Sequence, residues 1–296
     1  MIRSRLLWRN MRNVSRDARW RFPSSSMPAA SSRIPGLPRL TITKPLVLLI
    51  AAILSTVWAT SAAAVNPFIS TEHDPVLIGE QSEIEIGKNT DQQTRQKYRV
   101  SSDPLLHQRI DVIGQRLAAN SGRKIKYTFT VLDDPMVNAF AAPGGYIYIT
   151  TSLLKRLKND NETAAVLGHE VGHVVEKHSL KAVQRQMLAQ FGLQIMATLL
   201  GDGGLSQGLL LKASELSASL LLLKNSRVNE LQADVDGVRI MRLSGYDPRA
   251  MVDVQKMLLA EAKGKSGLAI LSTHPPSQER IDVIEKAIDD PNFRWQ

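Results

Sequence analysis

Two histidines separated by three residues, with a glutamate directly after the first, form the part of this sequence most suited to chemistry. They lie in Gly168-His169-Glu170-Val171-Gly172-His173, inside a helix that we expect over residues 162–178. Helical residues four apart differ by about 40° around the axis and about 6 Å along it, so both imidazoles leave one face and can bind one cation. Glu170, about 100° from His169, would place its carboxylate where it can deprotonate a metal-bound water. This division of roles is that of a zinc hydrolase.

The expected helix is mostly apolar and should be buried, and Asn159 with Glu162 supplies a capping-box pattern at its start. Buried histidines need polar partners, and a metal is a suitable one. On this motif alone, two surface histidines on an ordinary helix remain the alternative. His178, nine residues from His169, falls on the opposite face, and we interpret it as structural or surface.

Zinc held by two histidines takes a third protein ligand and leaves its fourth position open for water. The chain has no cysteine, so the third ligand must be His, Asp or Glu, and the best candidate is Glu230 in a second helix ending near residues 244–245. Asp234 lies one turn later on the same face, where it can accept the distal N–H of a ligand histidine. Without the first motif, such a pair of acids would indicate only a solvated helix.

Four short segments in a fixed order resemble the zinc metallopeptidases of the CAAX prenyl protease/HtpX family, most closely its bacterial periplasmic, BepA/Loi-like branch. The resemblance covers roughly residues 77–284. The segments are Asn138-Ala139-Phe140-Ala141 with Pro143-Gly144-Gly145, His169-Glu170-Val171-Gly172-His173, Ser226-Arg227 leading to Glu230 and Ala233-Asp234, and Thr273-His274-Pro275.

The resemblance implies a gluzincin site with one Zn²⁺ per chain. It assigns His169, His173 and Glu230 to the zinc and Glu170 to the role of catalytic base. It also implies polypeptide substrates, unfolded or envelope proteins among them. BepA carries a C-terminal helical-repeat domain, for which the chain beyond Thr273-His274-Pro275 is too short, so we expect a different set of partners.

The resemblance also places His274, in a histidine-proline loop, near the zinc as a further catalytic residue. Because the residue before a proline is extended or in a turn, this imidazole could swing toward the site. It could donate a hydrogen bond to the developing oxyanion, or it could occupy the open zinc position and keep the enzyme latent. A loop histidine with no catalytic part is the third alternative.

Residues 127–132 and 145–150 alternate in the manner of strands. In zincin-like peptidases the strand before the active-site helix is an exposed edge to which a peptide can add. Residues 146–149 are our candidate for this edge, with an ordinary internal strand as the alternative. The predicted substrate-binding residues are Asn138, Gly145, Tyr146, Ile147 and Tyr148.

The first 64 residues differ in kind from the rest of the chain. They hold ten Lys and Arg but only one acid, Asp17, so they carry the whole net charge of +9. The remainder is neutral, which argues against a nucleic-acid partner. An apolar run over residues 46–59 ends in Ser61-Ala62-Ala63-Ala64, which predicts an export signal cleaved after Ala64 and a periplasmic location. An uncleaved membrane anchor and a translation start at Met27 are the alternatives. Because the chain has no cysteine, the exported protein would have no disulfides.

Residues 193–223 are rich in Leu, Ser and Gly, and they predict a helical hairpin packed on the active-site helix. The alternative to this packed hairpin is that the segment makes peripheral contact with a membrane. Further helices are expected over residues 79–97, from Pro104 after an Asp103 cap, over 249–262 and over 278–289.

The sequence therefore predicts an α+β fold that is mostly helical, with a small sheet whose edge strand flanks the zinc cleft. The predicted domains are a leader, 1–64, and a metallopeptidase domain, 65–296. We expect a zinc metalloendopeptidase that acts in cell-envelope protein quality control. A periplasmic chaperone or adaptor with little proteolysis is the main alternative, and a purely structural zinc protein is a weaker one.

Overall fold

The computed structural model describes residues 75–192, 205–264 and 267–294. The predicted leader, 1–64, and residues 193–204 of the predicted hairpin lie outside the described residues. Among the described residues, no helix is both long and apolar enough to cross a membrane.

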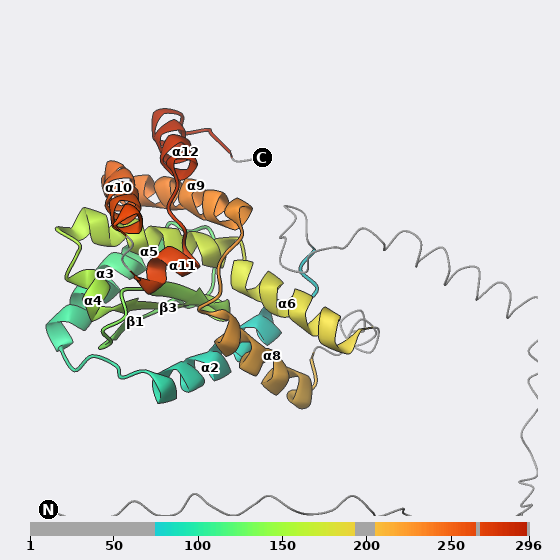
Figure 1. Cartoon of the computed structure of the whole chain (residues 1–296). Helices are drawn as coiled ribbons and strands as arrows, with labels where there is room; N and C mark the ends of the chain where they lie inside the picture. Colours follow the sequence, from blue (N-terminus) through green and yellow to red (C-terminus); the bar gives the residue numbers. More distant parts are fainter. Residues whose placement is uncertain (1–74, 193–204, 265–266, 295–296) are drawn as a thin grey trace, which may run out of the picture. The chain divides into compact units, whose positions relative to one another are not determined.

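The described elements are mostly helical, with a small sheet, as predicted (Figure 1). Their order is α2 (Glu80–Lys97), α3 (Pro104–Ala118), β1 (Thr128–Leu132), β2 (Ala139–Ala142), the 3-10 turn η1 (Pro143–Gly145), β3 (Tyr146–Thr150), α4 (Thr151–Leu154), α5 (Asp160–Val175), α6 (His178–Phe191), α8 (Gln207–Leu220), α9 (Arg227–Leu243), α10 (Arg249–Lys263), α11 (Ala269–Thr273) and α12 (Gln278–Asp289).

Side-chain caps begin the main helices where the sequence predicts them. The Asp103 carboxylate accepts from the backbone N–H groups of the first turn of α3, and Asn159 Oδ1 accepts from Glu162 N at 2.9 Å. The reciprocal half of the predicted capping box differs, because Glu162 Oε2 accepts from Lys158 N rather than from the cap residue itself. Each cap satisfies backbone donors that the helix leaves unpaired.

The sheet has the order β1-β3-β2, with β1 parallel and β2 antiparallel to β3. The prediction that residues 146–149 form the exposed edge is therefore wrong, since β3 is the central strand. The edge on the side of α5 and α6 is β2, which the sequence analysis read only as part of a motif. Its four residues are three alanines and Phe140, so they lack the β-branched pattern of a strand.

One face of the sheet packs on α3 and α5, and its Ile147 and Ile149 belong to the main core with Leu167 and Val171. The other face carries Phe140 and Tyr148 toward α2, with ring centroids 4.9 Å apart. Beyond α5 lie α9, α10 and α12 (Figure 1). The helix α5 is thus enclosed between the sheet and α9.

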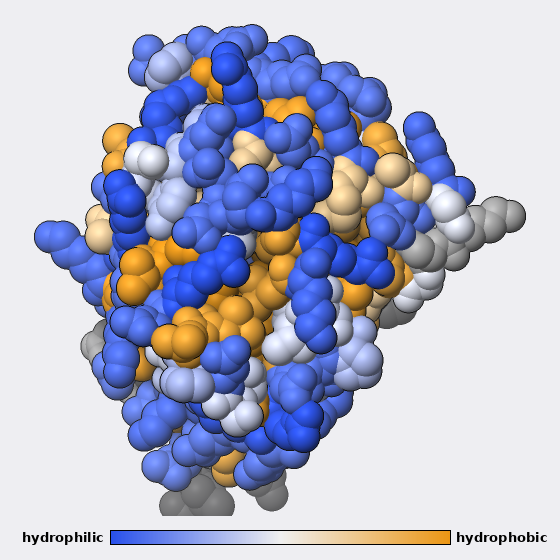
Figure 2. Space-filling view, turned by 90° about the vertical axis from the view of Figure 1, so that its left-hand side faces the viewer, coloured by the Kyte–Doolittle hydropathy of each residue, from blue (hydrophilic) through white to orange (hydrophobic). Residues whose placement is uncertain are grey.

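The described half of the predicted hairpin, α8, packs against α2 and α6 rather than mainly against α5. With Val183, Met187 and Ala213, α6 and α8 form a second, smaller core. Some hydrophobic side chains are exposed on the surface of the molecule. On the side of the molecule at the left of Figure 1, hydrophobic residues gather in the middle of hydrophilic ones (Figure 2).

Candidate metal centre

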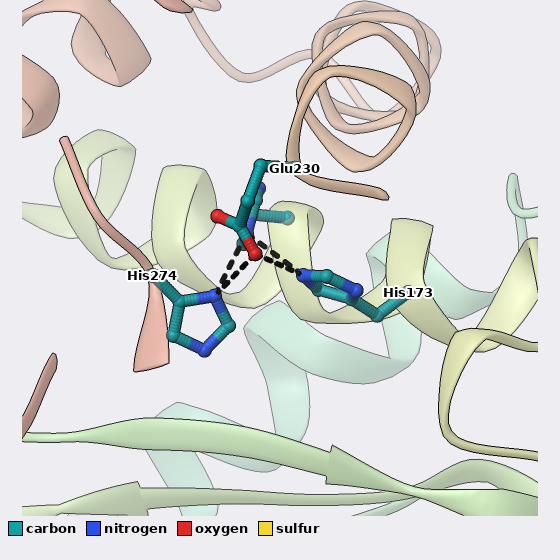
Figure 3. Close-up of side chains that lie close together, drawn as sticks. His173, Glu230 and His274 are labelled. Carbon is teal, nitrogen blue, oxygen red and sulfur yellow. Dashed lines mark hydrogen bonds and ion pairs between the residues drawn. The ribbon is translucent and has the colours of Figure 1, made fainter. Parts of the chain in front are cut away.

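Four side chains from three parts of the chain converge on one point between α5 and α9. They are His169, His173, Glu230 and His274, all buried, and each offers one ligand atom within 4.8 Å of the others. Figure 3 shows the Glu230 carboxylate, which comes from α9, directed between the imidazoles of His173 and His274.

The distances between these atoms suit a small tetrahedral ion. His169 Nε2 lies 3.0 Å from His173 Nε2 and 3.3 Å from His274 Nδ1. Glu230 Oε1 lies 3.3 Å from His173 Nε2 and 3.1 Å from His274 Nδ1. Ligands about 2.0–2.1 Å from a tetrahedral zinc are separated by about 3.3 Å, so the donor set has the spacing that zinc requires.

The helices α5 and α9 reach this spacing because glycines let their backbones touch. A Cβ added at Gly172 would lie 2.6 Å from the carbonyl oxygen of Ala233, and one at Gly237 would lie 3.2 Å from His169 N. The close approach brings Glu230, at the start of α9, against the two histidines of α5.

The second layer of the site consists of Asp234 and Arg280, both buried. Asp234 Oδ1 lies 2.9 Å from His169 Nδ1, which is the contact expected from the sequence. Arg280, on α12, donates to both Asp234 oxygens at 2.7 Å and lies 2.6 Å from Glu230 Oε2. The sequence analysis missed Arg280. Its signal was a charged residue on the apolar face of the last helix, in line with Ile284 and Ala287.

The charges of the site call for a cation. Burial alone would raise the pKa of Glu230, but Arg280 and the neighbouring histidines hold it well below its usual range. Burial likewise opposes ionisation of Asp234, and Arg280 outweighs it, so its pKa is also lowered. Glu170 is a third buried carboxylate, 3.6 Å from His274 Nε2. The guanidinium of Arg280 neutralises one of the two carboxylates Glu230 and Asp234, and a bound cation would balance the other.

The histidines respond differently to their surroundings. Burial would lower the pKa of His169, but Glu230 and Asp234 outweigh it and raise that pKa. For His173 burial prevails, and the pKa is lowered. Burial and the adjacent His173 hold the pKa of His178 well below its ordinary value, so His178 is neutral.

The sequence analysis wrongly placed His178 on the opposite face of the site helix. The expected helix over 162–178 ends as α5 at Val175, and Lys177 takes a left-handed conformation with φ 57°. The chain reverses there, so that His178 begins α6 and lies buried with its Nδ1 2.9 Å from His173 Nδ1. The surface interpretation of this histidine is therefore wrong.

His274 does not need to swing to reach the cluster. It follows α11, a short helix that the sequence analysis did not predict, and its backbone N–H donates to Ile270 O at 2.8 Å. The preceding residue, Thr273, donates to the side chain of buried Asn138 at 3.1 Å. Asn138 thus helps to hold the segment that carries His274.

Of the other predicted substrate-binding residues, Ile147 and Tyr148 are buried in the central strand, and the Tyr148 hydroxyl donates to Asp91 on the far face of the sheet. Gly145 has φ 88°, and a Cβ there would lie 2.5 Å from Lys126 O, so it serves the turn before β3, where Tyr146 begins the strand. The small cavity next to the metal cluster, about 80 Å³, is instead lined by Phe140 and Ala141 of β2.

The fold and the cluster together define a zincin-like metallopeptidase, and the sequence comparisons agree. The model of Peptidase family M48 matches residues 104–288, more than half of the chain. The chain belongs to this family of zinc-dependent metallopeptidases.

Curated relatives include two bacterial proteins and one mitochondrial protein. The chain is 30% identical over 212 residues to the beta-barrel assembly-enhancing protease of Escherichia coli, covering 67% of this chain and 42% of the relative. For the Yersinia pestis protein of the same name the identity is 32% over 192 residues, covering 60% and 38%. For the mitochondrial metalloendopeptidase OMA1 of Schizosaccharomyces pombe it is 33% over 182 residues, covering 61% and 52%. The chain thus spans about two fifths to one half of the length of these relatives.

Proposed function

We propose that this protein is a zinc-dependent endopeptidase in which His169, His173 and Glu230 bind the metal and Glu170 moves the protons. The convergence of the ligand atoms at spacings of 3.0 to 3.4 Å, with Glu170 beside them, carries the proposal. Bound zinc would polarise the scissile carbonyl and make water acidic enough to attack it near neutral pH.

The side chains have separable roles in this proposal. The Glu170 carboxylate takes a proton from the attacking water and returns it to the nitrogen of the leaving amine. Asp234 accepts the proton on His169 Nδ1 and so keeps His169 Nε2 free to bind. Arg280 keeps both Asp234 and Glu230 ionised and in place.

The binding strand for substrate in this proposal is β2, in place of residues 146–149. An extended peptide would pair with the outer edge of β2, beside the cavity that Glu170, His173 and His274 line. Residues 220, 221 and 223–226 also line this cavity, and Asn225 N donates to Thr273 O at 3.1 Å.

Elemental analysis and casein turnover of matched variants test the assignment. His169→Ala, His173→Ala and Glu230→Ala should each lose zinc, whereas Glu170→Gln should keep zinc and lose turnover. His107→Ala, a histidine on α3 away from the cluster, is the control and should resemble wild type. Full zinc occupancy in Glu230→Ala would refute its role as a ligand.

His274 is assigned to the latent state rather than to oxyanion binding. Its Nδ1 is as close to His169 and Glu230 as ligands of one ion are to each other, which favours occupation of the fourth zinc position. His274→Ala should then raise kcat/KM on an unfolded protein at unchanged zinc content. A fall of about 10²–10³ in kcat would instead support the oxyanion role, and no change would remove His274 from the mechanism.

We further propose that the protein is exported, with cleavage after Ala64, and that it degrades misfolded or unassembled cell-envelope proteins. The leader's composition and the names of the bacterial relatives support this role. Cleavage would leave Trp295 as the one tryptophan of the mature protein, which intact mass and N-terminal sequencing would reveal. A membrane-bound product that retains Trp58 would support an uncleaved anchor instead.

Purified protein incubated with unfolded and with folded outer-membrane β-barrels tests the substrate class. Cleavage of the unfolded form alone is expected. A wild-type protein that prevents aggregation without cutting, equally well as Glu170→Gln, would favour the chaperone or adaptor function. Vesicle flotation tests peripheral membrane contact through residues 193–223, of which 193–204 lie outside the described residues.

A further inference from the structure

We propose that His178, with Gln232 behind it, is a positioning residue that fixes the tautomer of His173 and thereby directs a lone pair of His173 at the metal. This inference rests on the proposed role of His173 as a zinc ligand. It adds a relay of two neutral side chains to that site.

The relay is a chain of two short contacts. Beyond the 2.9 Å contact between the Nδ1 atoms of His173 and His178, His178 Nε2 lies 3.0 Å from Gln232 Oε1. The two imidazoles meet edge to face, with ring centroids 5.0 Å apart. The relay therefore joins residues of α5, α6 and α9.

The position of each proton follows from the far end of the relay. Gln232 Oε1 can only accept a hydrogen bond, so His178 Nε2 must carry a proton. A neutral imidazole has one N–H, which leaves His178 Nδ1 as an acceptor. His173 Nδ1 must then be the donor of the 2.9 Å contact. His173 Nε2 is left with a free lone pair, and it faces the cluster.

His169 directs a second imidazole nitrogen, Nε2, at the same place. Asp234 lies against His169 Nδ1, so Nε2 is the atom of His169 that would bind a metal. His169 Nε2 and His173 Nε2 lie 3.0 Å apart, so a single cation could contact both. The two histidines are thus prepared for metal from opposite sides, one by a carboxylate and the other by a neutral relay.

The local backbone explains why His178 can serve here. Had α5 continued, residue 178 would lie about 140° around the axis from residue 173. The left-handed Lys177 reverses the chain instead, and Arg123 holds the reversal by donating to Val174 O at 2.8 Å. A neutral relay also adds no further anion to a site that already holds three buried carboxylates.

Zinc dissociation constants, measured by competition with a chromophoric chelator on the full chain, test the relay. His178→Leu should bind zinc about 10–100-fold more weakly than wild type, the range found when partners behind a ligand are removed. His178→Asn should recover part of this loss, because its amide oxygen can accept from His173 Nδ1. A purely structural role would not separate these two variants.

Gln232 offers a milder pair of variants in case those at His178 do not fold, which circular dichroism of the metal-free proteins would reveal. Gln232→Glu keeps an acceptor for His178 Nε2 and should bind zinc at least as tightly as wild type. Gln232→Leu removes the acceptor and should bind more weakly. His107→Leu is the control histidine and should match wild type.

The outcomes separate this inference from the function on which it rests. If His173→Ala loses zinc while His178→Leu keeps the wild-type dissociation constant, the relay is refuted and the ligand assignment stands. Equal constants for Gln232→Leu and Gln232→Glu also refute it. If His173→Ala keeps its zinc, the ligand assignment itself fails.

Discussion

Arg280 pairs with both Glu230, a proposed metal ligand, and Asp234, and its loss should be among the most damaging single changes. Arg280→Leu would leave two buried carboxylates without their guanidinium, and breaking a buried pair costs about 3–5 kcal/mol of unfolding free energy. Urea denaturation measures this loss. Arg227→Leu is a matched control, since Arg227 pairs with Glu279 in solvent and should change stability little. Equal stability losses in the two variants would contradict the argument.

Glu176, at the end of α5, gives a pH-dependent prediction. Burial and the nearby Asp236 raise its pKa above the ordinary value. The folded state therefore holds this proton more tightly, and its stabilising effect is present at low pH and lost as pH rises through the folded pKa. Glu176→Gln should raise the melting temperature near pH 7 and do so less near pH 4. Glu85→Gln, at an exposed position, should show no such dependence.

At the residue scale the sequence predicted the proposed ligand motif and the Asp234 contact behind it, but not the places of His178 and Arg280. His169, Glu170 and His173 lie within one helical motif, so their spacing is a local property. His178 and Arg280 join the site through a chain reversal at Lys177 and through the packing of α12 on α9. Neither event leaves a short-range pattern in the sequence.

At the level of elements, the α5–α9 contact sets the distance between Glu230 and the histidines. Gly172→Ala should force these helices apart, because its Cβ would lie 2.6 Å from Ala233 O, and backbone cannot move aside cheaply. We expect weaker zinc binding together with a lower melting temperature. Gly208→Ala on α8, where no atom lies within 4 Å of the added Cβ, should be neutral or slightly stabilising. Unchanged zinc affinity in Gly172→Ala would contradict this account.

The starts of α3, α5, α9 and α12 were predictable because their caps are local. Asp103, Asn159, Ser226 and Ser277 each accept from a backbone N–H two or three residues ahead. The strand order was not predictable, since β2 is short, rich in alanine and held as a strand by its pairing with β3. The analogy with zincin-like peptidases predicted β3 as the edge strand, whereas the edge is the preceding strand, β2.

For the whole molecule, folding and metal binding should be coupled. The proposed ligands come from α5 and α9, and His274 follows 105 residues after His169, so the assembled site exists only in the folded chain. A ligand present at 1,000 times its dissociation constant stabilises the folded state by about 4 kcal/mol. Chelation should therefore lower the melting temperature, and added zinc should restore it. His173→Ala should not respond, and a wild-type melting temperature independent of zinc would contradict the coupling.

If β2 binds substrate as proposed, its outer edge would also limit the length of peptide that can pair with it. Asn138 O accepts from Thr150 N, so alternation along the strand turns the polar backbone groups of Ala139 and Ala141 outward. One of these, Ala141 O, is already occupied by the Ser179 hydroxyl at 2.7 Å. A peptide paired there would be held over a short stretch that stops at Ala141, so kcat/KM should stop rising after a few added residues in a series of lengthening peptides. Ser179→Ala would free that carbonyl and let the rise continue to longer peptides.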